Sequence, residues 1–208
     1  MPKIQSPLAT LTEYLPEGSF DLVVHYIQEY KVHLTITRDR KTVLGNYTNK
    51  IYDKTHRISV NGTLNKYSFL ITLLHELAHL LTFEKHGHSI SPHGKEWKEE
   101  YGKILNEVMP FKVFPLEIEN VLLHTLKNPA ASSCADKHLM RVLRNYDKKK
   151  EGVVFIEELP TGSLFSIKDG RIFRKGERIR TRYRCTEVPG GKVWLFSAVY
   201  EVKHIPVS

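Results

Sequence analysis

One stretch of the chain, Leu70 to Phe83, combines hydrophobic residues at helical spacing with a few polar ones, and reads LITLLHELAHLLTF. At 100° per residue, its six leucines fall on one side of a helix. The polar residues His75, Glu76 and His79 fall in the opposite sector. The pattern predicts a helix from about Asn65 to Lys85 that buries its leucine stripe and gathers its polar residues on a second face.

The segment before this helix has one further helical pattern and three short alternating ones. Apolar residues at spacings of three and four predict an amphipathic helix over Ser19 to Tyr30. Alternation predicts strands at 32–38, 43–49 and 57–60, the last followed by an Asn-Gly turn signal at 61–62. The order helix, small sheet and second helix indicates an α+β fold.

The C-terminal part has a different pattern, with short alternating segments separated by sharp turns from Gly152 onward. It predicts strands at 153–157, 164–168, 171–174, 178–188 and 192–202. A set of short strands of this kind is typical of a small β-barrel-like domain. We therefore expect three parts: an α+β domain at 1–126, a helical and basic linker at 127–151, and a basic barrel-like domain at 152–208.

The net charge of +8 changes this picture because it is not spread evenly. Residues 1–126 carry 14 Lys+Arg and 14 Asp+Glu, whereas residues 127–208 carry 17 and 9. Within the predicted strand 178–188, arginines recur with period two, at Arg178, Arg180, Arg182 and Arg184. One face of that strand would then carry four guanidinium groups, which suits contact with the phosphates of DNA or RNA. The alternative is a charged strand face that prevents aggregation.

Composition excludes several classes of protein. Two cysteines are too few for a disulfide framework or a four-cysteine zinc site. The N-terminal residues do not resemble a signal peptide, and the one long apolar run is short and interrupted by polar residues, which argues against a membrane span. We expect a cytoplasmic protein without a membrane partner.

His75, Glu76 and His79 form an HExxH motif, in which two histidines one helical turn apart can hold a zinc ion while the glutamate acts on its bound water. A catalytic zinc also needs a third protein ligand. The downstream candidates are His86, His88, His93, Glu99 and Glu100.

Among these candidates, His86 would lie about 10 Å further along the helix axis than His79, too far to share an ion. His93 is better placed, because Gly87 can end the helix and the chain can then turn back. Ser91 and Pro92 would open a second helix with His93 in its first turn. Glu99 or Glu100 on that helix remains an alternative ligand. The metzincin spacing is not present.

The segment FLITLLHELAHLLTFEKHGHSISPHGKEWK resembles the SprT-like metallopeptidase domain, which is related to the Spartan protease that degrades proteins crosslinked to DNA. In that family a His-Gly pair and then an aromatic residue follow the HExxH motif, and His93, Gly94 and Trp97 match them. The resemblance covers about residues 20–126. It implies a zincin-like domain with His75, His79 and His93 as zinc ligands and Glu76 as general base.

The resemblance ends in the C-terminal part, where many SprT-like proteins have a zinc ribbon of four cysteines. Here the segment RYRCTEVPGG offers only Cys185, so the β-rich part stands in place of the ribbon. We expect a zinc-dependent endopeptidase that acts on protein substrates and associates with nucleic acid, as in the repair of DNA–protein crosslinks. The alternatives are a nucleic-acid-binding regulatory protein with a structural zinc, and a metal-free fold with structural histidines.

Overall fold

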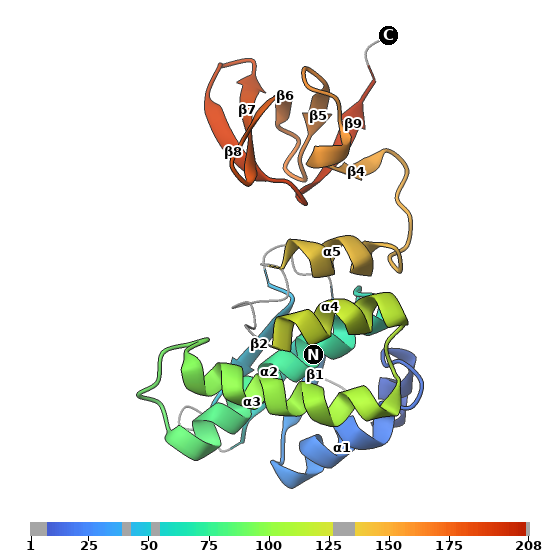
Figure 1. Ribbon diagram of the computed structural model, residues 1–208, viewed down its shortest axis with the longest axis vertical. Coiled ribbons are helices and arrows are strands. Elements are labelled where there is room, and N and C mark those ends of the chain that lie inside the picture. Colours follow the sequence, from blue (N-terminus) through green and yellow to red (C-terminus); the bar gives the residue numbers. More distant parts are fainter. Residues whose placement is uncertain (1–7, 39–42, 51–54, 127–135, 207–208) are drawn as a thin grey trace, which may run out of the picture. The chain divides into compact units, whose positions relative to one another are not determined.

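The computed structural model describes residues 8–38, 43–50, 55–126 and 136–206. The chain forms two compact units, residues 1–147 and 148–208, and each has its own hydrophobic core. Helices and a small sheet build the first unit, whereas strands dominate the second (Figure 1). The α+β class predicted from the sequence is confirmed. None of the helices in the described ranges combines the length and apolar character needed to cross a membrane.

The first unit contains both predicted N-terminal helices. Its helices are η1 (Leu8–Glu13), α1 (Phe20–Glu29), α2 (Lys66–His86), α3 (Lys95–Val108), η2 (Met109–Phe111), α4 (Leu116–Leu126) and α5 (Lys137–Arg144). Its strands are β1 (His33–Thr37), β2 (Gly45–Thr48) and β3 (Arg57–Asn61). These strands lie within a residue or two of the predicted ones.

The three strands form a sheet in the order β1-β3-β2, so that β2 is an edge strand. β1 runs parallel to the central strand β3, and β2 runs antiparallel to it. Helix α2 packs against β2 and β3 and also against α3 (Figure 1). The sheet and the neighbouring helices therefore enclose α2 on more than one side.

Helix α2 starts and ends at sequence signals that fix its length. The side chain of Asn65 accepts a hydrogen bond from the Ser68 N–H at 2.9 Å, which caps the first turn. Gly87 ends the helix with φ +75°, a conformation that glycine adopts at little cost. Between these ends, the run from Ser68 to Thr82 is buried except for the half-buried His79. The polar sector of α2 is thus covered by protein along with the leucine stripe.

Helix α5 belongs to the first unit, although the sequence analysis assigned residues 127–151 to a linker. Leu139 and Leu143 of α5 lie in the hydrophobic core of the first unit. The Asn65 side chain donates to the Leu143 carbonyl at 3.1 Å and to Asp147 at 2.6 Å. Residues 127–135 of the predicted linker lie outside the described residues.

The second unit is a sheet in the order β4-β9-β5-β6-β7-β8. Its elements are β4 (Val153–Phe155), η3 (Ile156–Glu158), β5 (Leu164–Ser166), β6 (Ile172–Ile179), β7 (Arg182–Val188), β8 (Val193–Ser197) and β9 (Glu201–Ile205). Within the described residues, β4 and β8 are the ends of this order and do not pair, so the sheet is open. Its core contains Phe165, Phe173, Cys185 and Phe196.

Two of the predicted C-terminal strands were wrong. The predicted strand 178–188 is interrupted by a hairpin turn at Arg180, where φ is +53°, so that it contributes to both β6 and β7. The predicted strand 192–202 is interrupted between β8 and β9. In the first segment arginine recurs at every second position through the turn, and in the second apolar residues continue at 198–200 between the two strands, so neither pattern marks the turn.

The hairpin also separates the four arginines that were expected on one strand face. Arg178 lies directly across from Tyr183, on the side of the sheet that carries the buried Cys185. Arg182 and Arg184 point to the other side of β7, and Arg180 lies in the turn. The expected row of four guanidinium groups therefore does not exist.

Candidate metal centre

Three histidines from two segments of the first unit meet at their Nε2 atoms. The Nε2 atoms lie 3.2 Å apart for His75 and His79, 3.0 Å apart for His79 and His93, and 3.1 Å apart for His75 and His93. Tetrahedral zinc with Zn–N bonds of about 2.0–2.1 Å separates its nitrogen ligands by about 3.3 Å. The triangle therefore has the size and the donor atoms that zinc requires.

The electrostatics of the triad suit metal ligation as well. Burial lowers the pKa of His75 to about 3 and that of His79 to about 4, and the neighbouring imidazoles act in the same direction. Burial also lowers the pKa of His93. The rings are thus neutral near pH 7, and a neutral imidazole has the free lone pair that a metal ligand needs.

Helix α2 positions His75 and His79 one turn apart, whereas His93 reaches them from the turn before α3. The first residue of α3 is Lys95 and its N-cap is Gly94, so His93 precedes the helix and does not lie in its first turn as predicted. His93 has φ +60°, a left-handed conformation that is costly for a residue with a side chain. Strain of this kind concentrates at functional sites, because the surrounding structure must hold it in place.

Trp97 of α3 forms the wall behind the three histidines. Its ring centroid lies 4.7 Å from that of His75, 4.8 Å from that of His93 and 5.4 Å from that of His79. The side chain is only 1% exposed, and its Nε1 has no hydrogen-bond partner among the described residues. An apolar wall of this size limits the access of water and fixes the ring orientations.

The alternative third ligands lie elsewhere. The carboxylate of Glu100 accepts from Lys85 at 2.6 Å and from Lys103 at 2.8 Å. Glu99 lies on the exposed side of α3, 3.9 Å from Lys95. Among the described residues, the one group of His, Cys, Asp and Glu side chains arranged to hold a metal ion is His75, His79 and His93.

Glu76 is held beside the triad by strand β2. Its side chain is 6% exposed, and its carboxylate accepts a hydrogen bond from the backbone N–H of Tyr47. Burial raises the pKa of Glu76 to about 7, while the Tyr47 N–H acts in the opposite direction. A Cβ atom on Gly45 would lie 2.7 Å from the Glu76 Oε1 and 2.6 Å from the Thr72 Cγ2. Glycine at position 45 is therefore what lets β2 approach α2 this closely.

Tyr47 also contacts a histidine of the triad. Its ring is parallel to that of His79, with an angle of 1° between the planes and 6.5 Å between the centroids. Its hydroxyl is hydrogen-bonded to the Nδ1 of the buried His56 at 2.8 Å. The sequence analysis missed Gly45 and Tyr47, although an isolated glycine inside a strand pattern is a known sign of close backbone approach.

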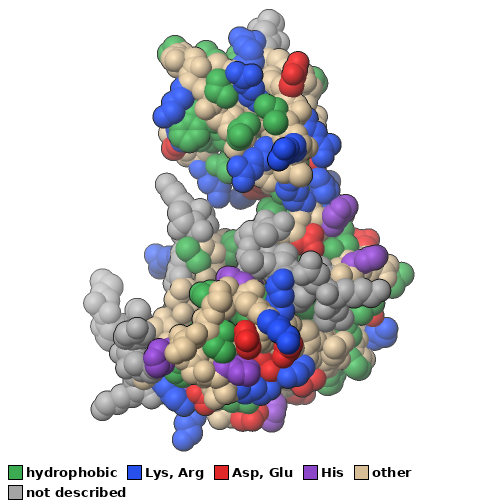
Figure 2. Space-filling model, turned by 60° about the vertical axis from the view of Figure 1, so that its left-hand side comes forward, with side chains coloured by type: hydrophobic (Ala, Val, Ile, Leu, Met, Phe, Trp, Pro, Cys, Tyr) green, Lys and Arg blue, Asp and Glu red, His purple; other side chains and the backbone are tan. Residues whose placement is uncertain are grey.

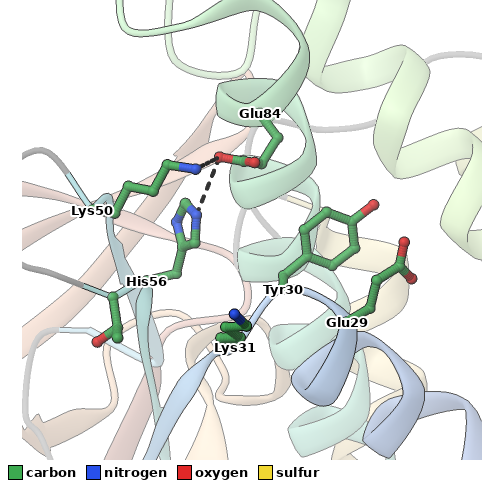
Figure 3. Close-up of a pocket in the computed structure, with 7 residues that line it drawn as sticks. Glu29, Tyr30, Lys31, Lys50, His56 and Glu84 are labelled. Carbon is green, nitrogen blue, oxygen red and sulfur yellow. Dashed lines mark ion pairs between the residues drawn. The ribbon is translucent and has the colours of Figure 1, made fainter.

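His56 connects this arrangement to a pocket of about 340 Å³ on the first unit (Figure 3). The His56 Nε2 lies 3.2 Å from the Glu84 Oε1, and the Lys50 Nζ lies 2.7 Å from the same oxygen. A polar chain thus runs from the pocket through Glu84 and His56 to Tyr47, which stacks on His79.

Comparison with known proteins identifies the family of this chain. The model of the SprT-like family matches residues 20–120, a range that includes the three histidines and Glu76. Protein SprT of Proteus mirabilis (strain HI4320) is 31% identical over 153 residues, which cover 72% of this chain and 83% of that protein. No solved structure matches the chain. The family model and this relative together show that the chain belongs to the SprT-like family.

Proposed function

We propose that the chain is a zinc-dependent endopeptidase with a zincin-like first unit. The observation that supports this most directly is the convergence of three neutral histidine Nε2 atoms within 3.2 Å of one another, next to a buried glutamate. His75, His79 and His93 would hold the ion. Zinc bound there would lower the pKa of a coordinated water and polarise the carbonyl of a peptide bond.

Glu76 has the place and the environment of a general base. Its carboxylate takes the proton from the attacking water and delivers it to the leaving amine. The Tyr47 N–H donates to this carboxylate and so fixes its orientation. Because the carboxylate is buried, protein groups instead of bulk water set its position before the reaction.

Strand β2 suits the binding of an extended substrate. It is an edge strand, and in the described part of the chain it pairs only with β3. Its residues Gly45 and Tyr47 approach Glu76 and His79. A substrate that pairs with a strand edge is held mainly by backbone hydrogen bonds, so we expect little sequence preference.

The substitution Glu76→Gln tests the proposal, because glutamine keeps the shape of the side chain and removes the base. Zinc content is measured by metal analysis, and cleavage is followed on an unfolded, fluorescently labelled protein with and without single-stranded DNA. We expect unchanged zinc content and a loss of cleavage of about 10²–10⁴-fold. Equal cleavage by parent and variant would refute the proposed mechanism.

The alternative function, a nucleic-acid-binding regulator with a structural zinc, gives a different result in the same experiment. The parent protein would then cut no substrate under any condition, while removal of zinc would unfold the first unit. The buried general base next to the triad favours the peptidase, because a structural zinc site does not need one.

A further inference from the structure

His56 is a buried residue of the first unit that the proposed mechanism does not use. It directly precedes β3, and its side chain is 4% exposed. Its backbone carbonyl accepts a hydrogen bond from the His33 N–H of β1 at 2.8 Å. Phe83 of α2 packs edge-on against its ring, with 5.8 Å between the two centroids. The imidazole is therefore held in one place by the sheet and by α2.

Both ring nitrogens of His56 have partners, and these partners fix its tautomer. The carboxylate of Glu84 lies 3.2 Å from Nε2, and the Tyr47 hydroxyl lies 2.8 Å from Nδ1. Burial lowers the pKa of His56, although Glu84 acts in the opposite direction, so the ring is neutral near pH 7. Since a carboxylate can only accept, Nε2 carries the proton and donates to Glu84. Nδ1 is then the acceptor for the hydroxyl of Tyr47.

Tyr47 connects these hydrogen bonds to the metal centre. Its backbone N–H donates to the carboxylate of Glu76. Its ring is parallel to that of His79, with 1° between the planes and 6.5 Å between the centroids. The ring of His56 is also nearly parallel to it, at 19° and 5.8 Å. Tyr47 thus contacts Glu76 and a histidine of the triad, while its hydroxyl is bonded to His56.

The strand that carries Tyr47 needs support from a second direction. β2 contains four residues, and in the described part of the chain it pairs only with β3. Ladder hydrogen bonds lie within the sheet, whereas Glu76 approaches β2 from α2. The bond to His56 ties Tyr47 to a residue that is itself packed on α2. Without this bond the Tyr47 N–H can shift relative to Glu76, and small displacements at a reacting group are costly.

The pocket beside His56 does not favour a ligand of one charge. Lys31 and Lys50 line it together with Glu29 and Glu84 (Figure 3). Acidic and basic side chains are also interspersed on the surface of the first unit that Figure 2 shows. Lys50 is paired with Glu84 at 2.7 Å. Because both nitrogens of His56 are bonded within the protein, its role is directed toward the metal centre.

We propose that His56 is a positioning residue for the metal centre. Through the Tyr47 hydroxyl it holds the Tyr47 ring beside His79 and the Tyr47 N–H on Glu76. Glu84 keeps the imidazole in the tautomer that accepts from this hydroxyl. The proposal rests on the peptidase proposed above, because it gives His56 an effect on the chemical step. It also predicts an effect on the geometry of the metal ligands, which can be measured without catalysis.

Three substitutions separate the bond to Tyr47 from the bond to Glu84. Tyr47→Phe removes only the hydroxyl and keeps the ring. In His56→Gln the amide nitrogen is as many bonds from Cβ as Nε2 is, so it can donate to Glu84 but leaves the hydroxyl without its acceptor. In His56→Asn the amide oxygen is as many bonds from Cβ as Nδ1 is, so it can accept from Tyr47 but does not reach Glu84.

The test uses the full chain, first with zinc and then with cobalt(II) in its place. Cleavage of the unfolded, fluorescently labelled protein gives kcat and KM, and the visible absorption spectrum of the cobalt form reports the geometry of the ligands. Tyr47→Phe and His56→Gln should each lower kcat by about tenfold, leave KM unchanged and shift the cobalt bands. His56→Asn should keep kcat and the cobalt spectrum close to those of the parent. The double variant Tyr47→Phe/His56→Gln should lose no more than either single variant, since both break the same bond.

The control is His25→Gln, which breaks an exposed contact of the same kind, 3.1 Å between His25 Nε2 and Glu29, and should behave like the parent. Circular dichroism and metal analysis establish that each variant is folded and loaded. A role of His56 in the fold alone would lower the thermal midpoint or raise KM, while kcat and the cobalt spectrum stayed at the parent values. That result would overturn the proposal, as would equal losses in His56→Asn and His56→Gln.

The cobalt spectra also separate this proposal from the proposed function. A parent protein that cleaves no substrate would refute the peptidase. The spectra alone would then decide whether His56 positions the ligands: bands that shift in His56→Gln and Tyr47→Phe but not in His56→Asn support it, and any other pattern overturns it.

Discussion

The backbone N–H of Tyr47 donates a hydrogen bond to the carboxylate of Glu76, and this bond joins the edge strand β2 to α2, the helix that carries His75, Glu76 and His79 and that we call the site helix. Tyr47 also stacks on His79, so one residue of β2 contacts both Glu76 and a histidine of the triad. The strand therefore orients the site in addition to supporting the fold.

The first prediction concerns Gly45. In Gly45→Ala, the added methyl group meets the Glu76 Oε1 and the Thr72 Cγ2, so the carboxylate has to move. We expect kcat to fall by about tenfold or more, because small displacements of a catalytic group are costly, while zinc content stays unchanged. Gly102→Ala in α3 is the matched control, since a Cβ there meets no atom within 4 Å. A Gly45→Ala variant with the kcat of the parent would show that Glu76 does not need this strand.

The second prediction distinguishes His93 from Glu100 as the third ligand. His93→Ala should lower zinc affinity by at least about tenfold in a competition with a chelator, because only His75 and His79 remain. Glu100→Ala should keep the zinc but lower the thermal midpoint, since it leaves Lys85 and Lys103 without their carboxylate. The reverse pattern would assign the ligand to Glu100.

The third prediction concerns the acid stability of the first unit. The hydrogen bond from Lys50, together with His56, lowers the pKa of Glu84 below its ordinary value of 4.5. A lowered pKa means that the folded state releases this proton more readily than the unfolded state. The stabilisation is therefore complete above the ordinary value and is lost as the pH falls through the folded-state pKa.

Glu84→Gln should accordingly lower the free energy of unfolding by about 0.5–1 kcal/mol at pH 7 and by less in acid. Urea unfolding followed by tryptophan fluorescence measures this difference, in a Trp194→Phe background so that Trp97 alone reports the first unit. The control is Glu17→Gln at an exposed glutamate. If the difference in the free energy of unfolding between the parent and Glu84→Gln grew as the pH fell, the predicted direction of the pH dependence would be wrong.

The fourth prediction concerns the bulge of β6. The register shifts between Lys175 and Arg178, and a Cβ on Gly176 would overlap the backbone carbonyl oxygen of Arg184. Because a backbone atom cannot rotate away, Gly176→Ala should destabilise the second unit by about 1–3 kcal/mol. Glu177→Ala, at the neighbouring bulge residue, should change the thermal midpoint little. Equal thermal midpoints for Gly176→Ala and the parent would show that the backbone of the hairpin makes room for the added methyl group without loss of stability.

The sequence predicts the part of the site that a single helix determines. Because His75, Glu76 and His79 are close in sequence, the helical period alone gives their relative positions. His93 was predicted as a nearby ligand, but its left-handed backbone was not, because residues 91–92 have the ordinary signals of a helix start. Gly45 and Tyr47 were missed because the register of a strand against a helix is a tertiary property.

In the second unit, a regular local pattern led to a wrong strand prediction. Arginine recurs at every second position from Arg178 to Arg184, and the turn at Arg180 contains neither glycine nor proline. The two-residue spacing of the arginines therefore continued through a hairpin, and the predicted strand face combined residues from two strands. The bulge at Gly176 shifts the register of β6. An isolated glycine is a signal for such a bulge, but the predicted strands 171–174 and 178–188 left this residue outside both.

The contacts of Asn65 determine where the first unit can be cut. This residue caps the site helix, and its side chain also donates to the Leu143 carbonyl and to Asp147. A fragment that ends at residue 126 would lose both of these acceptors and would expose the core that Leu139 and Leu143 cover. The shortest fragment that keeps the start of the site helix intact therefore ends at Asp147, about twenty residues beyond the last helix that the family resemblance covers.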